Sequence, residues 1–473
     1  MTDSPTRWSV AETVERVERG EVTAAAATGA HLTRIEERRS LNAYITVMAD
    51  QAREQAADID RKRAAGESLG PLAGVPLAIK DNILVAGVPC TCGSRILRDW
   101  IPPYEATVIE RLRGAGAVFV GKSNCDEFAM GSTTENSHYG PSRNPHDPER
   151  VPGGSSGGSA VAVADFQAVA GLGSDTGGSV RLPAALCGVV GLKPTYGAVS
   201  RWGLVAFASS LDQIGVFGRT VADTKAVFDV IRGHDPRDST SMRTNGARPA
   251  PKQLTIGWPE EYYGEGLDAE IRHSLEQTAN RLKDSGHKII PVSLPNSKYT
   301  IAVYYVICTA EASSNLARYD GVKYGHRADS PDDLLDMYRH TRAEGFGDEV
   351  KRRILLGTYV LSAGYYDAYY GTAQKVRTLI ADDFTRAFAT VDCLLTPTSP
   401  TCAFKLGEKM DDPLAMYLSD IYTTSINLAG LPAVSVPCGT SKGGLPIGAQ
   451  VIGRPFEEHL ILSVAEEIEK HRR

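Results

Sequence analysis

Short apolar runs that end in glycine, proline or a polar residue recur along the chain from residue 72 onward. The runs at 77–79, 117–120 and 169–172 are shorter than buried helices, and their lengths suit strands that are covered on both faces. Segments with helical character lie between these runs. The sequence therefore predicts an α/β protein.

A βαβ unit is predicted nearer the C-terminus. Residues 254–257 and 288–292 have strand character, and residues 268–284 between them carry an amphipathic helical pattern. The spacing over 300–390 is helical again, and residues 393–455 return to short strands punctuated by proline and glycine. The same sheet is thus expected to receive strands from both halves of the chain.

The first 65 residues predict an N-terminal helical layer. Ser9 and Glu12 have the spacing of a capping box, and residues 50–65 are polar with periodic alanine, isoleucine and arginine. A chain of 473 residues is long enough for two or three domains. It contains no internal repeat and no long low-complexity linker, so we expect one large domain over residues 1–473.

Composition narrows the class of protein. The 51 basic and 57 acidic residues give a net charge of −6, which argues against a broad basic face for binding nucleic acid. No apolar run approaches the roughly 20 residues that span a bilayer, and the N-terminus lacks a secretory pattern, so we expect a cytoplasmic protein.

The eight cysteines are too sparse for a disulfide framework, and Cys90 and Cys92 lack the partners of a zinc site. Reduced thiols and no metal are predicted.

Two glycine-dense loops open onto apolar segments, Gly153-Gly-Ser-Ser-Gly-Gly-Ser159 and Gly173-Ser-Asp-Thr-Gly-Gly-Ser179. Glycine lets backbone amides approach a ligand closely, so such loops commonly build anion or oxyanion pockets. A nucleotide-binding P-loop would end in Lys-Ser or Lys-Thr, which neither loop does. The structural alternative is a glycine-rich turn from strand to helix, which explains the glycines but not the paired serines.

The first loop also matches the nucleophile-elbow pattern G-x-S-x-G, with Ser156 at its centre. An elbow requires an apolar strand directly before the serine. Residues 144–152 contain three prolines instead, which a central strand does not tolerate. Ser156 is therefore the disfavoured alternative nucleophile.

Lys80 ends the apolar run at 74–79. A lysine in this position either extends its ammonium group to water or lies in a dry site where its pKa falls. Taken alone, the residue favours the first interpretation. Beside two glycine-rich serine loops it favours the second, because a serine hydroxyl becomes nucleophilic only when a neutral base accepts its proton.

In this combination the sequence resembles the amidase signature family. The family's three elements stand at its usual separations, in Gly74-Val-Pro before Lys80-Asp81, in the loop around Ser155, and in Asp175-Thr-Gly-Gly-Ser179. The likeness covers essentially the whole chain. It implies the amidase signature fold, a large mixed central sheet covered by helices on both faces, with residues 66–220 as the catalytic core.

The resemblance also implies a Ser-cisSer-Lys catalytic set. Ser179 would be the nucleophile, Ser155 the bridging serine in a cis peptide, and Lys80 the base. Backbone amides of the second loop would form the oxyanion hole that stabilises the tetrahedral intermediate. Those amides belong to Thr176, Gly177, Gly178 and Ser179.

Further segments resemble one branch of the family, the amidase subunits of tRNA-dependent amidotransferases. They include Asn124-Cys-Asp-Glu-Phe-Ala-Met-Gly131 and Gly364-Tyr-Tyr-Asp-Ala-Tyr-Tyr370. The branch uses glutamine as ammonia donor, so a pocket must bind an α-carboxylate and an α-ammonium. The resemblance implies Arg353 for the carboxylate and Asp420 for the ammonium, with Tyr304 nearby. Without it, Arg353 in the charged run 351–353 could equally lie on a solvated helix face.

The same branch implies partners. A larger subunit would bind tRNA and ATP with Mg²⁺, a small subunit would bridge the two, and the present chain would need no cofactor of its own. The acceptor would be Glu-tRNA(Gln), with Asp-tRNA(Asn) left open as a second one. Two alternatives stay open. The first is a stand-alone amidase that acts on another amide, whose pocket would lack the charged pair Arg353 and Asp420. The second is a non-catalytic scaffold subunit, and the presence of Lys80, Ser155 and Ser179 argues against it.

Overall fold

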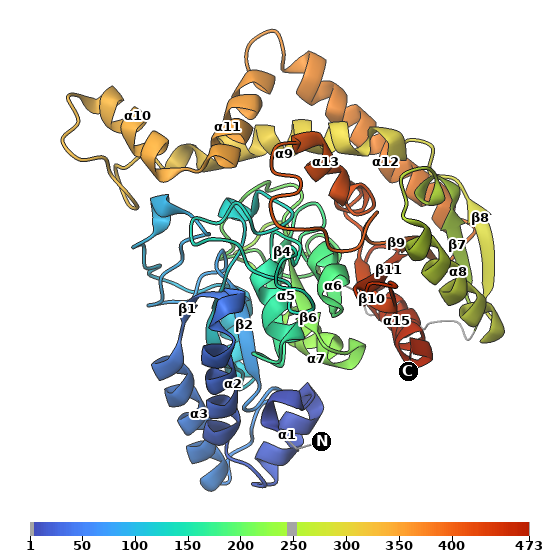
Figure 1. The fold of residues 1–473 in the computed structure, drawn as a ribbon. Helices are drawn as coiled ribbons and strands as arrows, with labels where there is room; N and C mark the ends of the chain where they lie inside the picture. Colours follow the sequence, from blue (N-terminus) through green and yellow to red (C-terminus); the bar gives the residue numbers. More distant parts are fainter. Residues whose placement is uncertain (1–3, 244–252, 473) are drawn as a thin grey trace.

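The computed structural model describes residues 4–243 and 253–472. Over these residues, eleven strands form one mixed sheet with helices on both sides (Figure 1), which confirms the predicted α/β class and sheet. The sheet order is β1-β3-β2-β4-β6-β5-β10-β11-β9-β7-β8. Strands from the first half of the chain thus occupy one end of the sheet, and strands from the second half occupy the other.

The first half of the sheet contains the predicted buried strands. Parallel neighbours β2 and β3, with β4 on the other side of β2, are fully buried, as continuous apolar runs require. Antiparallel β6 and β5 follow. The bounds are β2 (Pro76–Lys80), β3 (Val118–Ser123), β4 (Ala170–Asp175), β5 (Val190–Lys193) and β6 (Gln213–Gly218).

Helices α4, α5, α6 and α7 connect and cover these strands. The short helix α5 begins at Gly157 within the first glycine loop, and α6 begins just after the second, so each loop leads into a helix packed near the sheet. The bounds are α4 (Thr107–Gly114), α5 (Gly157–Ala164), α6 (Arg181–Cys187) and α7 (Val221–Ile231).

The second half of the sheet confirms the predicted βαβ unit. Strand β7 (Thr255–Pro259), helix α8 (Ala269–Asp284) and strand β8 (Lys288–Val292) follow one another, and the two strands pair in parallel. Strand β9 (Cys393–Pro397) pairs with β7 in parallel and with β11 in antiparallel orientation. The antiparallel pair β10 (Ala433–Thr440) and β11 (Pro446–Gly453) joins this half to β5, and α15 (Glu458–Arg472) packs on β10.

The N-terminal layer is helical with one exception. Helix α1 (Val10–Glu18) begins with the predicted capping box, and α2 (Ala24–Glu37) packs on α3 (Ala49–Ala64). Residues 44–47, which the sequence assigned to the helical layer, form strand β1 (Tyr44–Val47) at the edge of the sheet. The correction has a simple cause, because this segment pairs with β3 and its tertiary contacts outweigh the helical surroundings.

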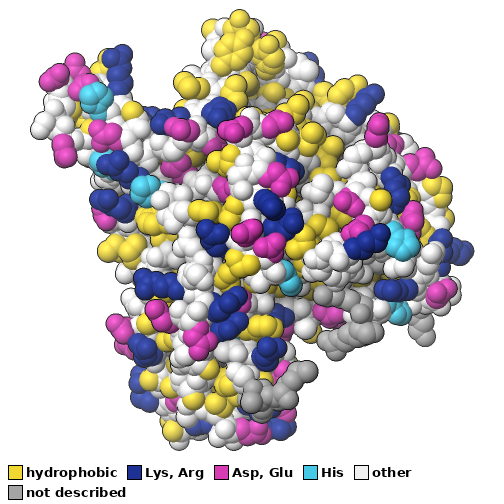
Figure 2. Space-filling view, viewed as in Figure 1, with side chains coloured by type: hydrophobic (Ala, Val, Ile, Leu, Met, Phe, Trp, Pro, Cys, Tyr) yellow, Lys and Arg dark blue, Asp and Glu magenta, His cyan; other side chains and the backbone are white. Residues whose placement is uncertain are grey.

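Helices from residues 300–390 form a layer above the catalytic half in the view of Figure 1. Helix α9 packs on α11 and α12, and α10 extends outward at one end. Large exposed side chains, among them Leu355, Tyr359 and Tyr366, gather on α11 and the adjoining π-helical turn η8, where Figure 2 shows apolar groups at the top. The bounds are α9 (Thr300–Asn315), α10 (Leu334–Gly345), α11 (Asp348–Val360), η8 (Asp367–Gly371), α12 (Thr372–Phe388), α13 (Pro413–Tyr417) and α14 (Thr424–Leu428).

All eight cysteines are free thiols, as predicted. None of the helices built from residues 4–243 and 253–472 combines the length and the apolar character needed to cross a membrane.

Candidate active site

Lys80 is the last residue of β2, and its side chain is completely buried. Its Nζ lies 2.7 Å from Ser155 Oγ, 2.9 Å from Ser156 Oγ and 2.9 Å from Ser174 Oγ. Burial lowers the pKa of Lys80 to about 8, although nearby carboxyl groups favour its charged form. The alternative in which the ammonium group extends to water is therefore wrong. Lys80 is a dry amine, and a fraction of it is neutral near pH 7.

Ser155 lies in the first glycine loop, between β3 and α5, and the Gly154–Ser155 peptide bond is cis. Its hydroxyl is buried against Lys80. The neighbouring Ser156 amide donates to the Ser179 carbonyl at 3.2 Å, which ties the first loop to the second. The structure thus brings all three predicted catalytic residues to one place, with Lys80 and Ser155 in direct contact.

The Ser156 hydroxyl group is engaged in hydrogen bonds with the strand that follows it. Its hydroxyl donates to the Ser174 carbonyl at 3.1 Å, accepts from the Ser174 amide at 3.2 Å and contacts Lys80. The side chain is fully buried, and a loop rather than a strand precedes it. Ser156 therefore braces the lysine, and its geometry argues against the nucleophile-elbow alternative.

Ser179 lies where β4 gives way to α6. Its side chain retains slight exposure, 9%, and within the described residues its hydroxyl makes no hydrogen bond. A hydroxyl in this state is open to a substrate. Among the described residues no hydrogen bond joins the Ser179 and Ser155 hydroxyl groups, so the relay requires these side chains to come within hydrogen-bonding distance.

The oxyanion hole needs one correction. The Gly178 amide, predicted as a donor to substrate, donates instead to Asp175 Oδ1 at 2.9 Å. Across residues 4–243 and 253–472, the amides of Thr176, Gly177 and Ser179 find no acceptor. The Gly178 amide is not available to the substrate because the Asp175 side chain, at the end of β4, caps the turn that follows this strand. Three of the four predicted donors stay available to a developing oxyanion.

A buried ion pair fixes this turn. Asp175 Oδ1 lies 2.9 Å from Arg181 Nη2, and both side chains are completely buried. Arg181 Nη1 also donates to Gln450 Oε1 at 2.7 Å and to the Thr423 carbonyl at 3.0 Å. Arg181 therefore anchors the nucleophile loop to β11 and to the segment that carries Asp420. The Arg181 guanidinium holds the pKa of Asp175 at about 2 against the opposing effect of burial, so the pair stays charged.

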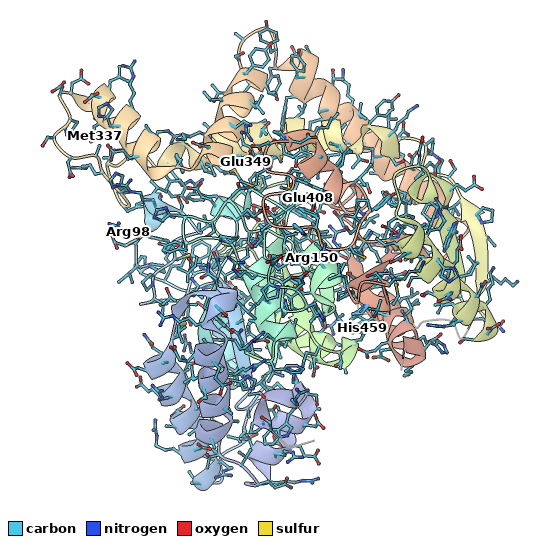
Figure 3. All side chains as sticks on the ribbon, in the orientation of Figure 1. Arg98, Arg150, Met337, Glu349, Glu408 and His459 are labelled. Carbon is cyan, nitrogen blue, oxygen red and sulfur yellow. The ribbon has the colours of Figure 1, made fainter. Side chains whose placement is uncertain are left out.

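Arg353 lies on α11 and is only 3% exposed, so the solvated helix-face alternative is wrong. Its Nε donates to Glu349 Oε1 at 2.7 Å. The guanidinium also lies 5.3 Å from the centre of the Tyr305 ring and 5.7 Å from that of Tyr417, within the range of cation–π contact. Glu349 is labelled in Figure 3 near the start of α11, above the catalytic half. The guanidinium is held rigidly in an aromatic enclosure.

Asp420 and Tyr304 approach the nucleophile loop from the second half of the chain. A Cβ added at Gly178 would lie 3.3 Å from Asp420 Oδ1, and one at Gly177 would lie 2.6 Å from the Tyr304 hydroxyl. Burial raises the pKa of Asp420 to about 7, although Ser132 and Arg353 favour its charged form. Asp420 and Tyr304, two of the three predicted substrate-binding residues, thus border the predicted oxyanion hole.

Several residues of the site were not predicted from the sequence. Ser174 contacts Lys80 and also accepts from Asn82 Nδ2 at 2.9 Å. Ser132 Oγ donates to Asp420 Oδ2 at 2.5 Å. Asp126, whose amide donates to the Ser155 carbonyl at 3.2 Å, caps the turn after it by accepting from three backbone amides. A polar residue at the end of a buried strand, as Ser174 is, was the one available signal.

Comparison with known proteins finds relatives over nearly the whole chain. The model of the family described as Amidase matches residues 26–462. The A subunit of glutamyl-tRNA(Gln) amidotransferase from Carboxydothermus hydrogenoformans is 57% identical over 98% of this chain and 97% of its own. The protein of the same name from Heliobacterium modesticaldum is 58% identical over 90% of this chain and 88% of its own.

Solved structures agree. The A subunit of glutamyl-tRNA(Gln) amidotransferase from Thermotoga maritima superposes with a TM-score of 0.82 at 42% identity, covering 100% of this chain and 96% of that one. A 6-aminohexanoate cyclic dimer hydrolase bound to its substrate superposes with a TM-score of 0.84 at 26% identity, covering 99% and 97%. The fold therefore carries more than one amide-hydrolysing chemistry. The chain belongs to the amidase family and, within it, to the branch of the glutamyl-tRNA(Gln) amidotransferase A subunits.

Proposed function

We propose that this chain is the glutaminase subunit of a tRNA-dependent amidotransferase. It hydrolyses glutamine through an acyl-enzyme on Ser179 and supplies the ammonia that converts Glu-tRNA(Gln) to Gln-tRNA(Gln). The observation that carries the proposal is the buried pair Arg353 and Asp420, in which the charge of Arg353 acts on the Asp420 carboxyl and Asp420 lies against the loop that bears Ser179. A pocket that binds a simple amide needs neither charged group, whereas a pocket that binds an amino acid needs one partner for the α-carboxylate and one for the α-ammonium.

In the first half-reaction, neutral Lys80 accepts the proton of Ser155, and Ser155 accepts the proton of Ser179. The Ser179 oxygen attacks the side-chain amide carbon of glutamine, and the carbonyl oxygen becomes an oxyanion. The free amides of Thr176, Gly177 and Ser179 donate to that oxyanion. Collapse of the intermediate breaks the C–N bond, and the proton held by Lys80 returns through Ser155 to the departing ammonia.

In the second half-reaction, water attacks the glutamyl ester on Ser179. Lys80 again serves as the base, now for the water proton, and returns it through Ser155 to the Ser179 oxygen as the ester bond breaks. Glutamate leaves and the free hydroxyl is restored. A lysine whose pKa lies at about 8 suits both directions of transfer, because it gains and loses a proton near neutral pH.

Substrate recognition follows from charge. The Arg353 guanidinium binds the α-carboxylate through its planar fork, with Glu349 fixing its orientation. Asp420 binds the α-ammonium, and the positive charge of the substrate shifts the Asp420 carboxyl to its ionised form. Tyr304 closes the side of the pocket next to Gly177.

The acceptor is bound by other chains. Acidic and basic side chains alternate over the face seen in Figure 2, and the net charge of −6 is unsuited to gripping a tRNA. We assign ATP, Mg²⁺ and tRNA binding to a larger partner subunit, with a small subunit bridging the two chains and no cofactor in this one. Ammonia reaches the partner through a passage shielded from water, since ammonia released to solvent at neutral pH would be protonated and lose its nucleophilicity. The chain would then act in the cytoplasm, where aminoacyl-tRNA is used.

The proposal is tested by comparing kcat/KM for glutamine with that for butyramide, which has the same reacting amide group but neither charge. Preference for glutamine by about two orders of magnitude or more is expected, because each buried charge would be left unpaired by butyramide. Equal or better turnover of butyramide would instead indicate a stand-alone amidase.

A further inference from the structure

Glu127 links the catalytic core to the helix that bears Arg353. It lies in the turn after β3 and is only 3% exposed. Its Oε1 accepts a hydrogen bond from the Ser94 hydroxyl, and its Oε2 accepts from the Gly347 amide at 2.8 Å. The carboxyl group therefore bridges the core and the segment that leads into α11.

Gly347 is the N-cap residue of α11 and has no side chain with which to cap the helix. The amides at a helix N-terminus lack partners within the helix and carry partial positive charge, so a carboxylate stabilises them. Glu127 supplies that carboxylate from the core. A Cβ added at Gly347 would lie 2.5 Å from Glu127 Oε2, so the contact also depends on glycine at this position.

The same helix holds the carboxylate-binding arginine. Arg353 stands six residues after Gly347 and pairs with Glu349 on the preceding turn. At 1.5 Å per residue this is about 9 Å along the helix axis, a distance over which a helix moves as a rigid rod. A shift of the N-terminus of α11 would therefore carry the guanidinium with it.

The residue before Glu127 contacts the catalytic loop. The preceding residue, Asp126, donates its amide to the Ser155 carbonyl, and a Cβ added at Gly154 would lie 2.2 Å from Asp126 Oδ2. Two adjacent acidic residues thus contact two parts of the site, with Asp126 on the serine loop and Glu127 on α11. This arrangement fixes the distance between the reacting groups and the arginine.

We propose that Glu127 is a positioning residue for glutamine, which holds the N-terminus of α11 so that the Arg353 guanidinium meets the substrate carboxylate at the distance that places the amide on Ser179. The inference rests on the proposed function and deepens it. Glu127 contacts no reacting atom, so its removal should weaken substrate binding and leave the chemical step nearly unchanged.

The pH dependence follows from the surroundings of Glu127. Burial raises its pKa to about 7, while hydrogen bonds from Ser94 and Gly347 favour the ionised form. An ionised carboxylate accepts a hydrogen bond more strongly than a protonated one, so the hold on α11 is fully present above pH 7 and weakens as the pH falls through 7. The titratable and charged groups around Glu127 are Asp126 in its own turn, Lys351, Asp348 and Glu349 on α11, Arg95 in the short helix η3 (Arg95–Leu97), Glu135 and His138 in the following loop, and Glu344 on α10.

The test measures kcat and KM of the full chain, alone and with its partner subunits, for glutamine, glutaramate and butyramide. Glutaramate has the carboxylate of glutamine without its ammonium, so it forms no ion pair with Asp420. For Glu127→Gln we expect KM to rise about tenfold for glutamine and glutaramate, with kcat within threefold and kcat/KM for butyramide within twofold. The wild-type KM for glutaramate should rise below pH 7, and Glu127→Gln should lose that dependence.

Two further variants sharpen the result. Gly347→Ala keeps the carboxylate but displaces it, and should raise KM in the same way. Glu344→Gln removes a carboxylate that lines the same pocket as Glu127 but pairs with His326, at 2.7 Å, and should change nothing. An unchanged KM for glutaramate in Glu127→Gln, an equal loss on butyramide, or the same effect from Glu344→Gln would overturn the inference. A wild-type chain that does not prefer glutamine to butyramide would instead overturn the proposed function.

Discussion

Lys80 Nζ lies 2.7 Å from Ser155 Oγ inside a completely buried cluster of hydroxyl groups. The contact joins the end of a central strand to a loop that follows a different strand of the same sheet. Of the three hydroxyl groups that contact Lys80, Ser155 is the one that the proposed relay uses to reach Ser179.

The pKa of Lys80 predicts how the rate depends on pH. Burial lowers this pKa to about 8, and only the neutral amine can accept a proton. As the pH falls through 8 the lysine becomes protonated, so kcat should fall, approaching tenfold per pH unit well below 8, and reach a plateau above it. A kcat–pH profile measures this directly. Lys80→Arg, which keeps the charge but does not deprotonate, should be inactive at every pH. An active arginine variant would exclude Lys80 as the base.

Substitution of Ser179 and substitution of Ser156 should have clearly different effects on activity. Ser179→Ala removes the nucleophile and should lower glutamine hydrolysis by about 10⁴-fold or more. Ser156→Ala removes only a brace of Lys80, and should retain measurable activity with a pH profile shifted to lower pH, because a hydrogen-bond acceptor for the charged amine is lost. Steady-state kinetics of the two purified variants make the comparison. Wild-type turnover in Ser179→Ala, with loss in Ser156→Ala, would reverse the assignment.

The charged pair should control KM rather than kcat. Arg353→Ala and Asp420→Ala each leave one charge of glutamine unpaired, and KM should rise by roughly 30-fold or more. Butyramide has neither charge, so its kcat/KM should change by no more than about threefold. Equal losses on both substrates would mean that Arg353 and Asp420 support the fold and do not recognise the amino acid.

Partner subunits should accelerate the reaction. If the acceptor site belongs to another chain, as proposed, closure of the complex should complete the glutamine site, and ammonia release should increase at least about fivefold when acylated tRNA and Mg-ATP are added. Ammonia is measured from the mixed subunits with and without acylated tRNA. No association and no acceleration would leave an independent amidase.

Much of the catalytic core could be predicted from the sequence, because its signals are local. Apolar runs fixed the positions of β2, β3 and β4, and the glycine loops marked where the helices after them begin. Lys80 was recognisable as the residue that ends a buried strand. Ser174 was not singled out, because its contact with Lys80 depends on the register of β4 beside β2, where Ile79 pairs with Leu172.

Other features depend on long-range contacts that no local pattern records. The hydrogen bond between Ser132 and Asp420 joins residues 288 positions apart. The use of the Gly178 amide by Asp175 depends on a side-chain rotamer rather than on a motif. Strand β1 has only four residues and lies between helices, so its strand character emerges only when it pairs with β3.

In the proposed mechanism Ser179 carries the acyl group. The most direct measurement is mass spectrometry of peptides from the chain, quenched with acid during turnover of glutamine. A glutamyl ester is expected on the peptide that contains Ser179, and it should be absent from Ser179→Ala and from the wild-type chain without substrate. An ester on the peptide that contains Ser155 and Ser156, or ammonia release with no ester on Ser179 in a rapidly quenched sample saturated with glutamine, would contradict it.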